Sequence, residues 1–303
     1  MSTRASDDGY DIYKTQDGGR SMKLGISAFA WTRSFGMKHL SWLPKVREYG
    51  FEGLEIPMFR PRDLPVAPLR MAFESNEMDC TVCVILPSGV NPIDADSDVR
   101  RRALAHLVEC VEVAAELGAR LLGGPVYAPI GYAVERRSTE EEWKRAIEML
   151  QRLGEKLDEN RMRLAVEPVN RSETSLLRTT EEARRLCAEI GNPAIGVTVD
   201  TFHANIEEKC IASSIERLGP MLSHLHLSEN DRGVPGSGHV PFPEIVATLR
   251  KMEYEGYGVI EGFGYAADEP DSPGALLADY AVSPEDIALR GLQYIRSLSV
   301  REC

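Results

Sequence analysis

Residues 98–126 read DVRRRALAHLVECVEVAAELGARLLGGPV and contain one helical pattern followed by one apolar run. Apolar side chains recur every three or four residues from Val99 to Ala115, which is the pattern of a helix that packs against a core along one side. Gly118 follows, at a place where glycine favours the left-handed conformation that ends many helices. The apolar run at 120–126 is too short for a helix and predicts a buried strand.

The same order of helix, glycine and apolar run recurs elsewhere in the chain. Gly50 and Gly256 also stand between a helical pattern and an apolar run. Short runs rich in Val, Ile and Leu predict buried strands at eight places. These runs are 23–27, 53–58, 80–86, 120–126, 163–169, 195–200, 223–228 and 258–263.

Strands that alternate with helices along a chain form a parallel sheet. Eight such units in a chain of 303 residues predict an α/β fold, a single (β/α)8 TIM barrel. A doubly wound open sheet is the alternative. Its dinucleotide-binding form needs a GxGxxG motif after the first strand, whereas this chain has the aromatic residues Phe29 and Trp31 there.

The composition is that of a soluble globular protein, with 43% hydrophobic and 27% charged residues. A net charge of −12 argues against binding nucleic acid through a broad basic face. No apolar run approaches the roughly 18 residues of a membrane span, so none is expected. Residues 1–21 are polar and lack the apolar segment of a secretory signal. We therefore predict a flexible extension at 1–21 and one catalytic barrel domain at 22–303.

Six cysteines are scattered along the chain, which is typical of reduced thiols and predicts a cytoplasmic protein. Cys80 and Cys83 form a CxxC motif, but they lie on an apolar run and have no second pair. We predict that these two thiols pack in the core and take no part in redox or zinc chemistry.

Acidic and histidine side chains stand at or near the ends of four consecutive predicted strands: Glu167, Asp200, His226 and Glu261. In a barrel, the carboxyl ends of the strands carry the catalytic groups. Three converging carboxylates would repel one another, and burying them without a partner is costly. A divalent cation resolves this conflict. Oxygen ligands with one imidazole suit Mn²⁺, Mg²⁺ or Co²⁺ better than a structural zinc site.

Each of these residues also has a simpler explanation. Asp200 could cap the helix that follows it, because aspartate is a favoured first residue of helices. His226 could be a hydrogen-bonded core histidine. Since all four occur together at one rim, we favour the metal-ligand interpretation over the helix cap for Asp200. His224, two residues before His226, is predicted to support it from beneath.

Longer motifs surround these residues. They are EPVNRSE at 167–173, VDTFHANIEE at 199–208, HLHLSENDRGVPGSGHVPF at 224–242 and VIEGF at 259–263. With these motifs the chain resembles the ketose 3-epimerases, the D-tagatose and D-psicose 3-epimerase family among the xylose-isomerase-like barrels. The resemblance runs from residue 22 to about residue 298.

The resemblance implies the role of each site residue. It makes Glu167, Asp200, His226 and Glu261 the metal ligands, with Mn²⁺ favoured over Mg²⁺ and Co²⁺. It also implies C3 epimerisation of a free ketose through a metal-stabilised enediolate, with Glu167 and Glu261 as base and acid. Further implications are a homo-oligomer, dimer or tetramer, and a set of residues that hold the sugar, namely Glu173, His203 and Arg232.

The first half of the chain matches the family less closely. Phe29, Trp31 and the segment 123–127 fall where the family lines its pocket. The loop at 127–132 lacks the tryptophan of the family, and this difference bears on which sugar is accepted.

Other activities use the same kind of site. An aldose–ketose isomerase, a keto-acid isomerase or a C-glycoside-cleaving relative would need the same metal. A sugar-binding protein without activity would not need the pair of glutamates. A DNA-repair endonuclease with several zinc ions fits poorly with the negative charge and with only six histidines. Arg232 and the glycine-rich loop after it could hold a phosphate, but no lysines cluster there, so we favour a free sugar.

Overall fold

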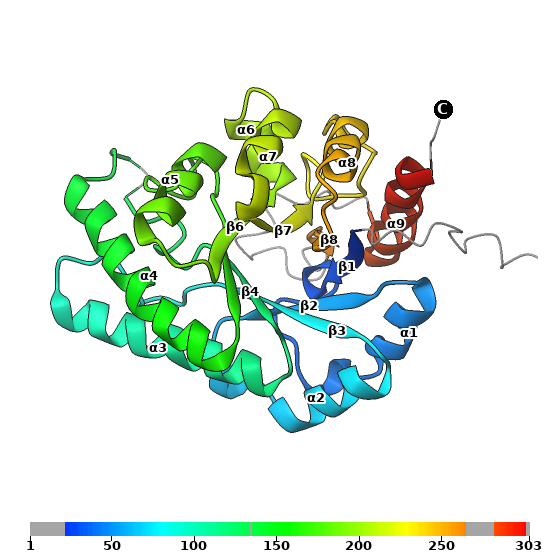
Figure 1. Ribbon diagram of the computed structural model, residues 1–303. Coiled ribbons are helices and arrows are strands. Elements are labelled where there is room, and N and C mark those ends of the chain that lie inside the picture. The colour runs from blue at the N-terminus through cyan, green and yellow to red at the C-terminus, as the bar shows by residue number, and fades with distance from the viewer. Residues whose placement is uncertain (1–21, 134, 265–281, 301–303) are drawn as a thin grey trace, which may run out of the picture.

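The computed structural model describes residues 22–133, 135–264 and 282–300. The predicted extension at 1–21 lies outside the described residues. Eight parallel strands form a closed barrel in which β1 pairs with β8, so the predicted (β/α)8 barrel is confirmed and the open sheet is excluded (Figure 1). The strands are β1 (Lys23–Ser27), β2 (Gly53–Met58), β3 (Asp79–Val84), β4 (Leu121–Gly124), β5 (Arg163–Val166), β6 (Ile195–Asp200), β7 (Leu222–Leu227) and β8 (Tyr257–Ile260).

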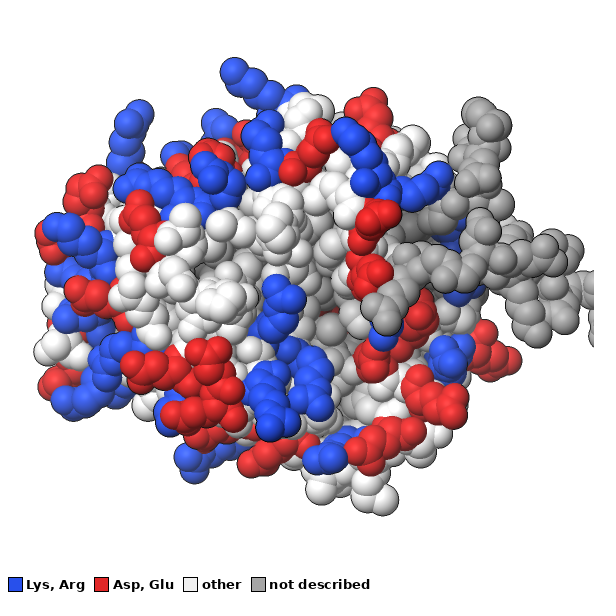
Figure 2. Space-filling model, in the orientation of Figure 1, with Lys and Arg blue, Asp and Glu red and all other residues white. Residues whose placement is uncertain are grey.

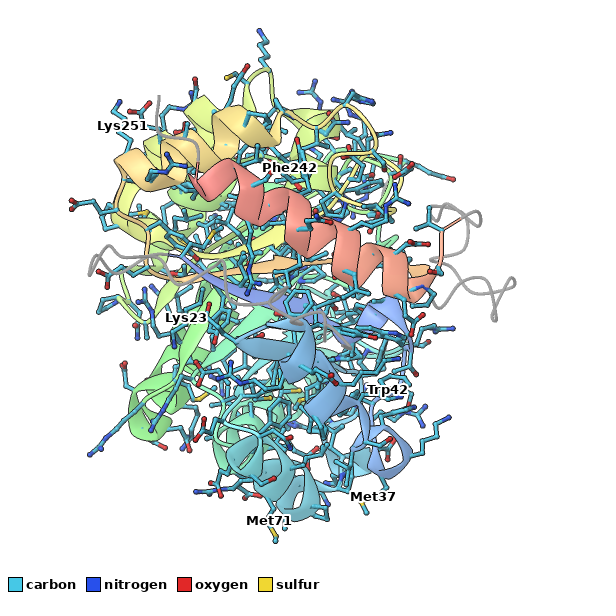
Figure 3. The ribbon with its side chains drawn as sticks, turned by 90° about the vertical axis from the view of Figure 1, so that its right-hand side faces the viewer. Lys23, Met37, Trp42, Met71, Phe242 and Lys251 are labelled. Atoms are coloured by element: carbon cyan, nitrogen blue, oxygen red, sulfur yellow. The ribbon has the colours of Figure 1, made fainter. Side chains whose placement is uncertain are left out.

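Helices surround the barrel on its outside (Figure 1). Those in the described residues are α1 (Trp42–Tyr49), α2 (Val66–Ser75), α3 (Ser97–Glu116), α4 (Glu140–Asn160), α5 (Thr180–Ile190), α6 (Thr201–Glu207), α7 (Ile211–Leu218), α8 (Phe242–Lys251) and α9 (Pro284–Val300). Short 3-10 turns are η1 (Ala28–Ala30), η2 (Met37–His39), η3 (Pro61–Asp63) and η4 (Gly219–Met221). Figure 3 shows α9 in front of the barrel, and Phe242 of α8 packs edge-on against Tyr294 of α9 with ring centroids 6.0 Å apart.

The helix predicted from residues 98–116 is α3. The carboxylate of Asp96 accepts a hydrogen bond from the backbone of Asp98 at 2.8 Å and so caps its first turn. Leu107, Val111 and Ala114 lie on the predicted apolar stripe and are buried. The stripe holds α3 against the barrel because removing these side chains from water stabilises the packed state.

Two of the three predicted glycine turns have the expected backbone. Gly50 and Gly118 have φ of 102° and 87°, in the left-handed region that ends a helix. The prediction for Gly256 is wrong, because Glu253 takes the left-handed conformation after α8 with φ of 53°. Gly256 is required for a different reason: a Cβ there would overlap the hydroxyl of Tyr254.

Most of the buried side chains in the described residues are apolar. Cys80 and Cys83 are buried and free in β3, which confirms core packing for the CxxC motif. Among the helices of the described residues, none has the length and hydropathy needed to cross a bilayer. Figure 2 shows basic and acidic side chains interspersed on the face that it presents.

Gly124→Ala is expected to lower the free energy of unfolding by about 3 kcal/mol or more, as backbone strain adds to a steric clash. Gly124 ends β4 with φ of 114°, and a Cβ there would overlap the carbonyl oxygen of Val84. Gly89→Ala is the control, since Gly89 has φ of 84° but no atom within 4 Å of the added Cβ. In urea unfolding, the control should lose only about 1–2 kcal/mol of its free energy of unfolding. If both variants lose the same free energy of unfolding, the clash at Gly124 is ruled out.

Candidate active site and metal centre

The four predicted metal ligands lie together at one end of the barrel. Asp200 is the last residue of β6, His226 lies in β7, and Glu167 and Glu261 directly follow β5 and β8. Each of the four is at most 4% exposed. Nδ1 of His226 lies 3.1 Å from Oε1 of Glu167 and 3.6 Å from Oε2 of Glu261. The closed barrel therefore places two carboxylates that are far apart in the sequence next to the same nitrogen, Nδ1 of His226.

This arrangement fits a divalent cation. Ligand atoms of Glu167, Asp200 and His226 all lie within 4.8 Å of one another. Ligands that are about 2.1 Å from an octahedral cation stand about 3 Å apart, close to the spacing between His226 and Glu167. The donors are carboxylates and one imidazole, with no thiolate, as Mn²⁺, Mg²⁺ or Co²⁺ prefer.

Asp200 uses its two carboxylate oxygens differently. Oδ1 accepts a hydrogen bond from the backbone of Phe202 at 2.8 Å and caps α6. Oδ2 faces the site and accepts a hydrogen bond from Arg232 at 2.6 Å. The helix cap, which the sequence analysis ranked second, is therefore present, and one oxygen is still directed into the site.

Arg232 is buried at the centre of this cluster. Its Nη1 donates hydrogen bonds to Asp200, to Oε2 of Glu261 at 2.5 Å and to Oγ of Ser228 at 2.8 Å. Its guanidinium lies between the rings of Phe202 and Phe263, at 4.3 and 4.6 Å from their centroids. The family resemblance implies only a sugar contact for Arg232. The structure adds that its charge also offsets two of the predicted metal ligands.

The predicted sugar-holding residues form one connected group with Arg232. Nη2 of Arg232 lies 3.1 Å from Nε2 of His203. The backbone of Asn170 donates to Nδ1 of His203 at 3.2 Å, and the side chain of Asn170 donates to Glu173 at 2.8 Å. The motif EPVNRSE contains Asn170 but does not show its role, which is to join Glu173 of the loop after β5 to His203 of α6.

Burial and charge set the protonation of the site. Burial raises the pKa of Glu261 to about 8, although the charges of His226 and Arg232 act in the opposite direction. Burial also acts to raise the pKa of Asp200, but the charges of Arg232, His203 and His226 together outweigh it and hold that pKa below its usual range. Burial acts to lower the pKa of His226, yet the neighbouring carboxylates raise it well above the ordinary value. A bound cation favours the charged form of a carboxyl and would lower the pKa of Glu261.

A further buried carboxylate, Glu55 in β2, was not among the predicted site residues. Its Oε1 lies 2.9 Å from Nε2 of His226, and its Oε2 lies 2.8 Å from Nε2 of His224. Thr81 donates a hydrogen bond to Oε2 at 3.1 Å. The signal for Glu55 was a lone acid inside the apolar strand GLEIPM. His224, predicted to support His226, shares Glu55 with it.

Apolar side chains line the other part of the rim. Phe29, Phe59, Ile85 and Phe263 pack with Cys83 after β1, β2, β3 and β8. Of the residues expected in the pocket, Phe29 therefore lies beside the site.

Two other aromatic residues of the first half have different packing partners. The ring of Trp31 packs against that of Trp42 at 5.7 Å. Tyr127, the last residue of the segment 123–127, is fully buried and donates its hydroxyl to the carbonyl of Leu177 at 3.0 Å, so it belongs to the core.

The chain is similar to known proteins over most of its length. The family described as xylose isomerase-like TIM barrel matches residues 43–298. A probable ketose 3-epimerase of Synechocystis is 28% identical over 91% of this chain and 96% of its own length. A D-psicose 3-epimerase of Enterocloster bolteae is 32% identical over 80% of this chain and 82% of its own.

A solved structure shows the same architecture. The D-psicose 3-epimerase of Clostridium cellulolyticum H10 with D-tagatose superposes with a TM-score of 0.80 at 25% identity, covering 93% of this chain and 100% of the other. The chain thus belongs to the xylose isomerase-like TIM barrels and, among them, to the ketose 3-epimerases, which are isomerases.

Proposed function

We propose that this protein epimerises a free ketose at C3 and that it requires a divalent cation, with Mn²⁺ favoured. The proposed ligands are Glu167, Asp200, His226 and Glu261. One observation carries the proposal: carboxylates that follow strands β5 and β8 both reach the same nitrogen of His226, at 3.1 and 3.6 Å. Two acids on different sides of one charged centre are what the exchange of a proton between two faces of a sugar requires.

The chemistry assigns a separate task to each group. When bound, the cation would polarise the ketone and stabilise the negative charge that develops beside it. One of Glu167 and Glu261 would remove the proton from C3, and the other would deliver a proton to the opposite face. Arg232, His203 and Glu173 would hold the O1 end of the sugar, because they form one connected group that Arg232 joins to Glu261.

The glycine-rich loop after Arg232 supports a free sugar as the substrate. Three of its backbone amides, which a phosphate would need, already donate to acidic side chains. Gly236 and Val240 bond to the carboxylate of Glu229 at 2.8 and 3.0 Å, and Gly233 bonds to Asp231 at 2.9 Å. A phosphate there would also meet the charge of Glu229. A homo-oligomer and a cytoplasmic location remain predictions.

Proton exchange in D₂O tests the reaction. The Mn²⁺-loaded enzyme should incorporate deuterium at C3 of D-fructose, D-psicose, D-tagatose or L-ribulose, and the C3 epimer should appear at the same time. After removal of the enzyme and the metal, NMR identifies the labelled carbon. Label at C1 or C2 together with an aldose product would indicate an aldose–ketose isomerase instead.

His203→Ala is expected to lower kcat/KM by about 10- to 100-fold, which corresponds to the loss of one hydrogen bond to a charged or polar partner. The affinity for Mn²⁺, measured by titration calorimetry, should change by less than about threefold. His239→Ala, an exposed histidine, is the control. If His203→Ala abolishes metal binding while Asp200→Ala preserves it, then Asp200 is only a helix cap and His203 is the ligand.

A further inference from the structure

We propose that Glu55 is a positioning residue that fixes the ring of His226 so that Nδ1, and not Nε2, is the metal-binding nitrogen. The inference rests on the proposed metal site. It concerns a buried residue of β2 that faces Nε2 of His226, whereas Glu167 and Glu261 face Nδ1 of the same ring. Glu55, His224 and His226 are each 0% exposed, so solvent offers no competing partner.

The contacts of Glu55 determine which ring nitrogens carry a proton. Each oxygen of its carboxylate faces the Nε2 of a different histidine, at 2.9 Å for His226 and 2.8 Å for His224. The hydroxyl of Thr81 donates to the same carboxylate. An ionised carboxylate only accepts hydrogen bonds, so both Nε2 atoms must donate. A neutral His226 therefore has its lone pair on Nδ1.

That lone pair is directed at the site. Nδ1 of His226 faces oxygens of Glu167 and Glu261 at 3.1 and 3.6 Å. A bare nitrogen and two carboxylate oxygens all present electron density and repel one another unless a cation stands between them. Glu55 thus keeps the proton of a neutral His226 on Nε2 and leaves Nδ1 available to a metal ion. Without a cation, a proton on Nδ1 takes its place between His226 and Glu167.

A competing interpretation makes Glu55 itself a ligand, because its oxygens and the Nε2 atoms of the two histidines lie close enough to share an ion. The one-to-one pairing favours hydrogen bonds. Each histidine meets a different oxygen of Glu55, and Thr81 takes up one of those oxygens as well. The two interpretations differ in the number of metal ions bound per chain.

The test uses Glu55→Val, which removes both acceptors, and Glu55→Gln, whose amide oxygen can accept from only one histidine. Glu142→Gln is the matched control, because Glu142 is also a buried, hydrogen-bonded glutamate but belongs to the first turn of α4. Titration calorimetry gives the Mn²⁺ affinity and stoichiometry. Long-range ¹H–¹⁵N NMR of histidine-labelled, Mg²⁺-loaded protein gives the tautomers, since Mg²⁺ is diamagnetic and the chain has six histidines.

In the unsubstituted protein we expect one Mn²⁺ per chain and a proton on Nε2 of His226, whose signals are assigned by their loss in His226→Ala. Glu55→Val should lose this tautomer and bind Mn²⁺ about 10- to 100-fold more weakly, as is typical for the partner of a metal-bound histidine. The Mn²⁺ affinity of Glu55→Gln should lie between that of Glu55→Val and that of the unsubstituted protein. Glu142→Gln should retain both the tautomer and the affinity.

Each contrary result overturns one statement. Unchanged tautomer and affinity in Glu55→Val, or in Glu55→Gln if the valine variant does not fold, would remove the positioning role. Two Mn²⁺ ions in the unsubstituted protein and one in Glu55→Gln would make Glu55 a ligand. If His226→Ala binds Mn²⁺ normally, the proposed metal site fails, whatever the Glu55 variants do.

Discussion

Glu167→Gln and Glu261→Gln are each expected to lower kcat by at least about a hundredfold, the lower end of the range for general acid–base groups. An amide keeps the shape of the side chain but cannot accept or deliver the proton. Both residues are buried beside His226, so water cannot easily replace them. The measurement is turnover of the ketose identified by deuterium exchange, followed by chromatography of the two epimers.

The same residues are proposed metal ligands, so the assay must separate the two roles. Turnover should be measured at saturating Mn²⁺, after calorimetry has given the affinity of each variant. A loss of kcat that persists at saturating Mn²⁺ is caused by impaired proton transfer. Glu142→Gln should retain normal turnover, because its carboxylate bonds to Arg136 and Thr139 away from the site. Near-normal turnover in either site variant would remove that residue from the mechanism.

Removal of the metal with EDTA is expected to abolish activity, and Mn²⁺, Co²⁺ or Mg²⁺ should restore it. The cation would offset the mutual repulsion of Glu167, Asp200 and Glu261, which His226 and Arg232 offset only in part. No other group in the proposed site would polarise the ketone as strongly. Activity is compared before and after dialysis, with the metal content verified by elemental analysis.

Metal removal should also lower the melting temperature. A cation that binds only the folded protein stabilises it by about 2.7 kcal/mol at a hundred times its dissociation constant. In a protein of this size, this corresponds to a shift of roughly 5 °C. Asp200→Asn, which weakens the site, should show a smaller shift on adding Mn²⁺. Full activity in verified metal-free protein would exclude the metal from the reaction.

The positions of the strands could be predicted because their signal is local. Each strand is a short apolar run, and Gly50 and Gly118 mark the turns before two of them. The ends were less accurate: β4 and β5 stop at Gly124 and Val166, two and three residues before the predicted ends at 126 and 169. There the chain leaves the sheet to form the loops of the site, and apolar character continues into those loops.

The proposed metal ligands could be picked out from the sequence for a similar reason. Glu167, Asp200 and Glu261 each stand at the end of an apolar run, and position along a strand decides which rim they reach. Glu55 and Asn170 do not stand at the end of an apolar run in this way. Glu55 contacts His226 across 171 positions of sequence, and Asn170 contacts His203 across 33. No pattern within either segment indicates those partners.

The sequence by itself determined the barrel and the acids that stand at the ends of its strands, because hydrophobic periodicity and strand ends are properties of neighbouring residues. Only the tertiary structure decided which partners each of these side chains contacts. It directs one oxygen of Asp200 to the cap of α6 and the other to Arg232. It also places Glu55 beneath His226. These contacts depend on the register of eight strands around a closed barrel, and a shift of one residue in that register would turn each side chain to the other face.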